Sequence, residues 1–380
     1  MSRVALSNAL LLDPEAAAPA PGGLLLEDGR IARRLAAAEP PPADAELVDL
    51  AGLALAPGLL DVHYHGELVL GAPEDAGAAL ARAAAALLRD GVTGFLPTTV
   101  AWPEAELLAR VGALAAACAA GSRGAAVLGL HLEGPWIAAD AAGAQPPAGI
   151  RACAPREAER VLERAHGLVR MVTLAPELPG AAGLLAELGR RGVVAALGHS
   201  QADAEQVGAA VAGGARHVTH LWNAMSGLHH RAPGLAGAAL ADDRLSCDLI
   251  CDGVHVHPLA VRVAARAKRE RLVLITDRVS AGAGFGAGAL VDDGTALRLA
   301  DGRLAGSRLT LDRAVRNAEA FGAMTQLEAV AAATLRPARL LGLERERGTL
   351  RPGARADLVV LDAAGGVAET WLAGERVYAA

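Results

Sequence analysis

The chain has 380 residues, which is enough for one large domain with or without a small companion. Its formal net charge of −6 argues against a general nucleic-acid-binding surface, and its 53% apolar but only 2% aromatic composition predicts a core of Ala, Leu and Val. No apolar run is long enough to span a membrane, no signal segment opens the chain, and four cysteines do not make a disulfide framework. We therefore expect a soluble, cytoplasmic protein with no membrane or nucleic-acid partner.

Both ends of the chain have β character. Residues 1–54 contain short apolar strands and turns, among them a hairpin at residues 23–31 with Asp28-Gly29 at its turn. Residues 336–380 return to short strands at 357–361 and 367–378. The simplest arrangement is one small β-sandwich domain formed by the two chain ends.

Residues 55–335 have a different rhythm, in which short apolar runs alternate with Ala-rich segments of helical composition. Eight such runs end near residues 62, 97, 131, 174, 197, 220, 251 and 276. This alternation predicts a (β/α)8 TIM-like barrel as the catalytic domain. A doubly wound open sheet is the alternative, but no G-x-G-x-x-G motif follows an early strand.

Metal-ligating residue types stand where the predicted strands end, which is where such barrels carry their chemistry. His63 and His65 follow the first strand, and because strand residues alternate they share a face. The others are Glu133 after the third strand, His199 after the fifth, His220 after the sixth and Asp277 after the eighth. Any one of them could be structural, but four imidazoles and two carboxylates at one rim favour a divalent metal site.

The remaining histidines do not follow this pattern. We expect His131 to line the pocket or support a ligand, His217 to be structural, and His166 and His257 to lie at the surface, while the role of His229 and His230 stays open.

The rim pattern resembles the amidohydrolase superfamily, many members of which bridge two metals with a carboxylated lysine after the fourth strand. The only lysine here, Lys268, lies in a predicted helix just before the eighth strand. The carboxylate must therefore come from elsewhere, and Glu133 supplies it. This excludes the lysine-bridged subtypes of the superfamily.

A more specific resemblance, to the N-acetylglucosamine-6-phosphate deacetylase family, rests on several motifs in order. They are Pro57-Gly58-Leu59-Leu60-Asp61-Val62-His63-Tyr64-His65-Gly66, His131-Leu132-Glu133-Gly134-Pro135, Gly198-His199-Ser200, Thr219-His220-Leu221-Trp222-Asn223-Ala224-Met225, Asp252-Gly253-Val254-His255, Thr276-Asp277 and Leu304-Ala305-Gly306-Ser307. The resemblance covers residues 57–307 and resumes at residues 336–338 and 353–360.

The resemblance implies a metal held by Glu133, His199 and His220, with Asp277 as the catalytic acid/base. His63 and His65 allow a second metal, so one or two divalent ions are expected per subunit, with Zn favoured and Fe, Mn or Co as alternatives. Implied substrate contacts are Ala144, Gln145, Asn223, Ala224, Arg231, His255, Leu304, Ala305 and Gly306. The resemblance also implies a homodimer in which Arg231 can reach the neighbouring active site.

The implied activity is hydrolysis of the acetamide of N-acetylglucosamine 6-phosphate to glucosamine 6-phosphate and acetate. An N-acetylgalactosamine-6-phosphate deacetylase or another metal-dependent amidohydrolase remains an alternative. A third alternative, from a different functional class, is a non-enzymatic scaffold whose site has decayed. Two residues depart from the family pattern. Gln145 stands where a histidine is common, which leaves the exact hexosamine open, and Arg336 replaces an asparagine at a position where we expect no functional effect.

Overall fold

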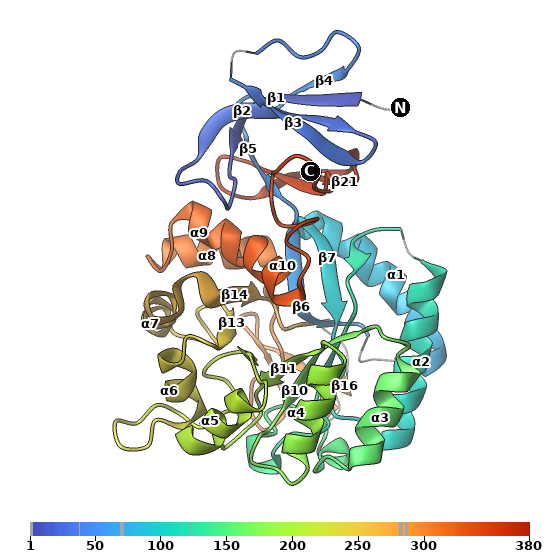
Figure 1. Ribbon diagram of the computed structural model, residues 1–380, viewed down its shortest axis with the longest axis vertical. Coiled ribbons are helices and arrows are strands. Elements are labelled where there is room, and N and C mark those ends of the chain that lie inside the picture. Colours follow the sequence, from blue (N-terminus) through green and yellow to red (C-terminus); the bar gives the residue numbers. More distant parts are fainter. Residues whose placement is uncertain (1–2, 38, 69–71, 122, 281–283, 286–287) are drawn as a thin grey trace.

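The computed structural model describes residues 3–37, 39–68, 72–121, 123–280, 284–285 and 288–380. A sheet that contains both chain ends lies above a barrel of parallel strands and surrounding helices (Figure 1). Among the described residues, no helix is long and apolar enough to cross a lipid bilayer.

The terminal sheet confirms the β domain expected from both chain ends. Its eight strands are β1 (Arg3–Leu11), β2 (Ala20–Glu27), β3 (Arg30–Ala36), β4 (Glu46–Asp49), β5 (Ala54–Pro57), β20 (Leu358–Leu361), β21 (Val367–Leu372) and β22 (Glu375–Ala379). They are joined in the order β22-β21-β20-β5-β1-β2-β3, with β4 beside β1. The sheet encloses a core that includes Leu6, Leu24, Leu55 and Leu358. Asp28 and Gly29 both adopt positive φ in the turn between β2 and β3, as a tight hairpin requires.

The barrel strands follow the predicted runs. They are β6 (Leu59–Gly66), β7 (Val92–Pro97), β8 (Ala126–Val127) continued by β9 (Leu130–Glu133), β10 (Val169–Leu174), β11 (Val194–Leu197), β12 (His217–Val218), β13 (Ser246–Ile250) and β14 (Leu272–Ile275). All neighbours pair in parallel, in chain order from β6 to β8 and from β9 to β14.

Contacts across two seams close the ring. A parallel bridge joins Thr98, after β7, to His131 in β9. Across the opposite seam, Asp61 in β6 accepts a hydrogen bond from the Thr276 hydroxyl, just after β14, at 2.6 Å. With β8 and β9 counted as one strand, eight strands surround the axis, and the predicted (β/α)8 barrel is confirmed.

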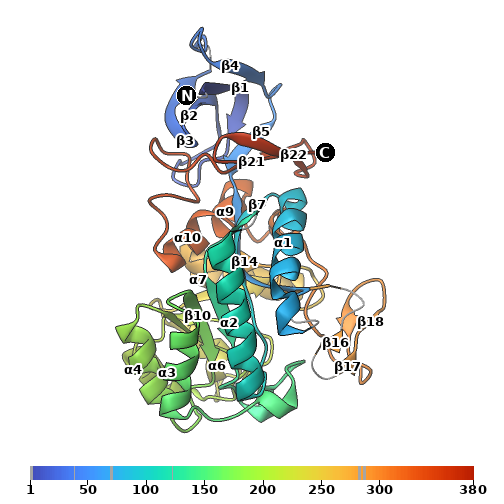
Figure 2. The same ribbon diagram turned by 90° about the vertical axis from the view of Figure 1, so that its right-hand side faces the viewer.

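Helices cover the barrel on its outside (Figures 1 and 2). They are α1 (Ala76–Leu87), α2 (Glu104–Ala120), α3 (Pro155–Arg164), α4 (Ala181–Arg190), α5 (Ala204–Ala212), α6 (Gly234–Ala241), α7 (Pro258–Lys268), α8 (Leu311–Ala320), α9 (Gln326–Ala332) and α10 (Leu335–Leu341). Capping boxes at Asp203/Gln206 and Thr325/Glu328 fix the starts of α5 and α9.

Short elements occupy the long connection after β14. They are β15 (Arg278–Val279), β16 (Gly284–Phe285), β17 (Gly288–Ala289), β18 (Val291–Asp292) and β19 (Leu297–Arg298). β15 extends the barrel sheet beside β6, whereas β16 to β18 project from one side of the barrel (Figure 2). A parallel bridge between Arg278 in β15 and Ser307 places the residues just after β19 close to the carboxyl ends of the barrel strands.

Lys268, at the end of α7, is buried far from those carboxyl ends. Its Nζ donates to the carbonyl oxygens of Ala239 at 2.7 Å and Asp242 at 2.8 Å. The lysine therefore ties α7 to the end of α6, and it does not stand on β10, where lysine-bridged amidohydrolases carry theirs.

Candidate active site

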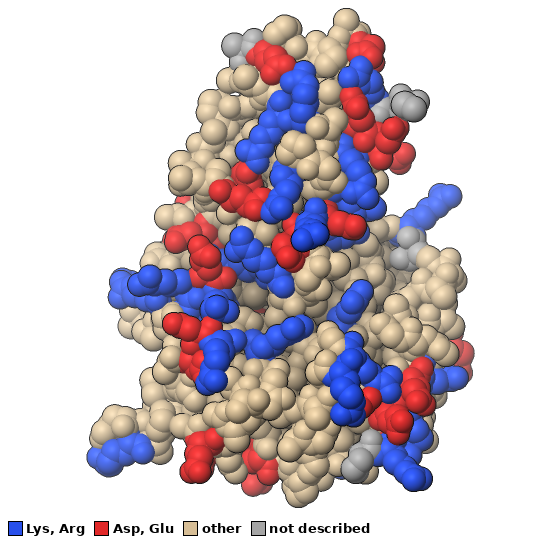
Figure 3. Space-filling view, in the orientation of Figure 1, with Lys and Arg blue, Asp and Glu red and all other residues tan. Residues whose placement is uncertain are grey.

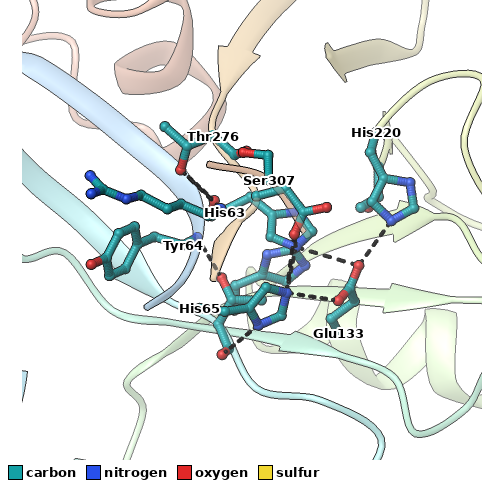
Figure 4. A network of polar contacts seen from close by, with 12 residues as sticks. His63, Tyr64, His65, Glu133, His220, Thr276 and Ser307 are labelled. Atoms are coloured by element: carbon teal, nitrogen blue, oxygen red, sulfur yellow. Dashed lines mark hydrogen bonds and ion pairs between the residues drawn. The ribbon is translucent and has the colours of Figure 1, made fainter. Parts of the chain in front are cut away.

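The alternation of side chains along β6 turns His63 and His65 into the barrel together. Both rings are buried, and their Nε2 atoms are 3.3 Å apart (Figure 4). His65 is oriented by the carbonyl oxygen of Thr98, which lies 3.1 Å from its Nδ1.

Glu133, the last residue of β9, lies at the centre of four imidazoles. Its Oε1 is 2.9 Å from His220 Nε2, 3.1 Å from His199 Nε2 and 3.4 Å from His63 Nε2. Its Oε2 is 3.2 Å from His65 Nε2 (Figure 4). Glu133 therefore belongs to two groups of possible ligands, one with His63 and His65 and the other with His199 and His220, and in each group the ligand atoms lie within 4.8 Å of one another.

Asp277 follows β14 and faces the same histidines. Its Oδ1 lies 3.2 Å from His65 Nε2 and 3.4 Å from His63 Nε2. The Asp277 N–H donates to the carbonyl oxygen of His63 at 2.9 Å, which fixes the start of the loop against β6. The structure thus brings together all six residues predicted for the rim.

Three of these six residues have left-handed backbone conformations, with φ of 48° at His199, 32° at His220 and 50° at Asp277. Such conformations cost about 1–3 kcal/mol each and persist only where surrounding contacts hold them. The contact at His220 is a hydrogen bond from its N–H to the buried carboxylate of Asp248. Strain at the end of each strand therefore turns these side chains into the barrel.

The hydrogen bonds around the rings test whether the site suits a metal. His199 Nδ1 lies 2.8 Å from the carbonyl oxygen of Ala141, and a carbonyl can only accept, so Nδ1 carries the proton. The Thr98 carbonyl fixes His65 in the same way. In the neutral rings both Nε2 atoms then present lone pairs to the carboxylate oxygens of Glu133. A cation between these acceptors removes the conflict, so the donor set fits a divalent metal.

The charged groups of this cluster shift one another's pKa values. Burial lowers the pKa of His65 and His220, but Glu133 and Asp277 outweigh it and raise these pKa values to about 10 and about 9. Burial raises the pKa of Glu133, but His63, His199 and His220 together hold it well below its usual range. The pKa of Asp277 is likewise lowered, because His63 and His65 outweigh its burial. The pocket keeps both carboxylates ionised and attracts positive charge.

A cavity of about 260 Å³ opens onto this cluster. Of the residues predicted to contact substrate, those that line it are Ala144, Gln145, Asn223, Ala224, His255, Leu304 and Gly306. Ala305 is buried beside them and is not part of the lining. Arg231 is not in the lining either; it is exposed, bonded to the neighbouring His230, on a loop before α6 that projects from the barrel (Figure 1). The exposed His229 lies on the same loop.

Gln145 has a second role within this lining. Its oxygen accepts the Ala101 N–H at 2.7 Å, and its amide nitrogen donates to Glu133 Oε2. The amide is thereby hydrogen-bonded to the ligand carboxylate, whereas the resemblance implied that it contacts the substrate.

Arg303 also lines the cavity, and it was not predicted from the sequence. It directly precedes Leu304-Ala305-Gly306, which the resemblance implied as substrate contacts. That adjacency is the sequence feature from which Arg303 could have been predicted. Its guanidinium donates to the carbonyl oxygen of Gly143 and pairs with Asp301 at 2.7 Å. Among the described lining residues it is the only arginine.

The other histidines take supporting or surface positions. His131 is buried, with its Nε2 2.8 Å from Thr173 Oγ1 and its ring 4.6 Å from that of His63. His217 is buried between Ser246 and Asp248, at 2.7 and 3.0 Å. His166 and His257 are exposed. None of these four lines the cavity.

Comparison with known proteins agrees with this architecture. Residues 54–377 match the Amidohydrolase family. An N-acetylgalactosamine-6-phosphate deacetylase of Escherichia coli O157:H7 is 39% identical over 352 residues, with 90% of this chain and 92% of the relative covered. The human N-acetylglucosamine-6-phosphate deacetylase is 41% identical over 350 residues, with 87% and 85% covered.

A solved structure is similar over nearly the whole chain. It is a mutant N-acetyl-D-glucosamine-6-phosphate deacetylase from Mycobacterium smegmatis in complex with N-acetyl-D-glucosamine-6-phosphate, with a TM-score of 0.88, 36% identity, and 99% of this chain and 100% of that chain covered. The amidohydrolase family is metal-dependent, in agreement with the His/Glu clusters at the carboxyl ends of the strands. The chain therefore belongs to the amidohydrolase family and, within it, to the N-acetylglucosamine-6-phosphate deacetylases.

Proposed function

We propose that this chain hydrolyses the acetamide of N-acetylglucosamine 6-phosphate to give glucosamine 6-phosphate and acetate. The observation that carries the proposal is the convergence of four imidazoles and two carboxylates on one small cavity. The relative from Escherichia coli O157:H7, named for the galactosamine epimer, makes N-acetylgalactosamine 6-phosphate the second candidate substrate.

Glu133, His199 and His220 are the residues that would hold a metal, and His63 and His65 with Glu133 would hold a second one. When bound there, a divalent cation supplies Lewis acidity, which polarises the acetyl carbonyl and acidifies the attacking water. Zn suits imidazole and carboxylate donors, as do Fe, Mn and Co.

Asp277 is the proposed acid/base. Its lowered pKa leaves it ionised near neutral pH, so it can accept the proton of the attacking water. It then returns that proton to the sugar nitrogen, which must be protonated before the C–N bond breaks. Where no second metal is bound, His63 and His65 position the Asp277 carboxylate, since their Nε2 atoms lie 3.4 and 3.2 Å from its Oδ1.

His255 is the proposed donor to the substrate. Asp252 Oδ2 lies 2.6 Å from His255 Nδ1, which fixes the ring and leaves Nε2 for a sugar hydroxyl or the acetyl oxygen. Asn223, Ala224, Ala144 and the segment Leu304-Ala305-Gly306 would form the walls around the sugar. Arg303 adds a guanidinium suited to the phosphate, because its fork of N–H groups can bind two oxygens.

A homodimer would bring a second arginine to the site. Arg231 is exposed on a projecting loop, so we propose that it reaches the phosphate in the neighbouring subunit. Mixing an Asp277→Asn protein with an Arg231→Ala protein tests this. Partial recovery of activity in the mixture supports a shared site, and none contradicts it. A cytoplasmic location completes the proposal.

Acetate release tests the activity. Purified protein loaded with Zn should release acetate from N-acetylglucosamine 6-phosphate with a higher kcat/KM than from its galactosamine epimer or from unphosphorylated N-acetylglucosamine. A higher value with the epimer would favour the second candidate. Equal values with and without phosphate would instead indicate a metal-dependent amidase that does not recognise the phosphate.

A further inference from the structure

A second cavity, of about 580 Å³, lies at the opposite end of the barrel from the candidate active site. Arg216 directly precedes β12, Ser246 begins β13 and Arg271 directly precedes β14, so the cavity opens at the amino ends of three consecutive strands. α10 forms its other side. On the face shown in Figure 3, basic side chains lie among acidic ones at the level of this helix.

The lining is strongly basic in a chain whose net charge is −6. Its arginines are Arg216, Arg244, Arg271, Arg336 and Arg339, and Glu270 is the only acidic residue among the described residues that line it. A concentration of one sign of charge in a hollow focuses the field and attracts ions of the other sign. The composition of the lining therefore points to an anionic ligand.

The carboxylates nearby do not neutralise this charge. Asp242 pairs with Arg244 at 2.6 Å, but Glu270 lies 3.9 Å from Arg339 and is largely exposed. Within the described part of the chain, no carboxylate lies within 4.0 Å of the guanidinium groups of the remaining three arginines, Arg216, Arg271 and Arg336. These groups are thus available to a ligand.

Burying the guanidinium of Arg336 costs free energy. Its residue is only 8% exposed, and its Nη1 donates to the carbonyl oxygen of Leu272 at 3.1 Å. Burial lowers its pKa to about 10, so the guanidinium is still charged at neutral pH. Glu328 and Glu270 favour its charged form, but neither makes an ion pair with it, so an anion in the cavity would further offset the cost of burying this charge.

The chemistry of the lining also limits the kind of anion. Guanidinium groups match phosphate oxygens in pairs, and the cavity has the volume of a small-molecule site rather than that of a single ion. We propose that this cavity binds a phosphate-bearing small molecule at a site separate from the active site. The proposal makes Arg336, for which the sequence suggested no functional effect, a part of that site.

Calorimetric titration of the metal-loaded protein with fructose 1,6-bisphosphate and with inorganic phosphate tests this. Three proteins are compared: the wild type, an Arg216→Ala/Arg271→Ala variant and an Arg123→Ala/Arg313→Ala variant. The last is a matched control, since both its arginines are exposed, lie outside the cavity and have no ion pair among the described residues. Both double variants change the net charge equally, and thermal unfolding checks that each is folded.

We expect the Arg216→Ala/Arg271→Ala change to weaken binding of the bisphosphate by about tenfold or more, because each lost contact is a charge-assisted hydrogen bond. The control should bind like the wild type. If inorganic phosphate binds only at the active site, its affinity should be the same for all three proteins. Equal binding by all three proteins, equal weakening in both variants, or no binding of either probe to the wild type would overturn the proposal.

Discussion

The side-chain amide of Gln145 is hydrogen-bonded to the carboxylate of Glu133, the residue on which both groups of possible metal ligands depend. The amide cannot turn away freely, because its oxygen accepts the Ala101 N–H at 2.7 Å. Gln145 therefore acts on the carboxylate that holds the metal, and its effect on catalysis should pass through Glu133.

Replacing Gln145 by leucine should therefore lower metal affinity by about 10–100-fold, the usual effect of losing a group that orients a ligand. Gln145→His, which restores an N–H donor, should recover part of that loss, and Glu133→Gln sets the lower limit. Metal titration followed by fluorescence or calorimetry measures all three. If Gln145→Leu kept its metal affinity and only raised KM, Gln145 would be a substrate contact, as the sequence suggested.

Metal binding should depend on pH with a defined sign. In the metal-free site the pKa values of His65 and His220 are about 10 and about 9, so both rings hold protons at pH 7. A metal must displace those protons, and its affinity should rise as pH increases from 6 to 9 and level off above the histidine pKa values. Calorimetry in buffers of different ionisation enthalpy measures the protons released. An affinity that is flat across this range would contradict the assignment of these rings as ligands.

Lys268→Met should affect stability and leave the chemistry unchanged. The variant leaves the carbonyl oxygens of Ala239 and Asp242 without their donor, which should cost about 1–3 kcal/mol of unfolding free energy. Denaturant unfolding measures that cost, while metal content and kcat at saturating metal should match the wild type. Loss of metal from the folded variant would mean that the only lysine of the chain takes part in the metal site after all.

Much of the fold follows from local patterns. The eight apolar runs, which alternate with segments of helical composition, predict the barrel because strand and helix periodicity are properties of short segments. The same runs predict which residues stand at the carboxyl ends of the strands, so His63, His65, Glu133 and Asp277 could be placed at one rim from the order of residues alone.

The rest depends on contacts between distant segments. Gln145 turns to Glu133 because the Ala101 N–H, 44 positions earlier, holds its oxygen. Arg303 reaches the cavity only because the chain returns through β15 and β19 to the barrel. Arg336 joins a basic cavity because α10 packs over strand ends that are far away in the sequence. Sequence periodicity carries no information about such contacts between residues that are distant in the sequence.

The measurement that tests the central claim most directly is turnover and metal content in Asp277→Asn. The substitution keeps the shape of the side chain but removes the group that accepts the proton of the attacking water. We expect the metal-loaded variant to bind N-acetylglucosamine 6-phosphate and to retain its metal while acetate release is abolished. Acetate release at the wild-type rate by the metal-loaded variant would contradict the account.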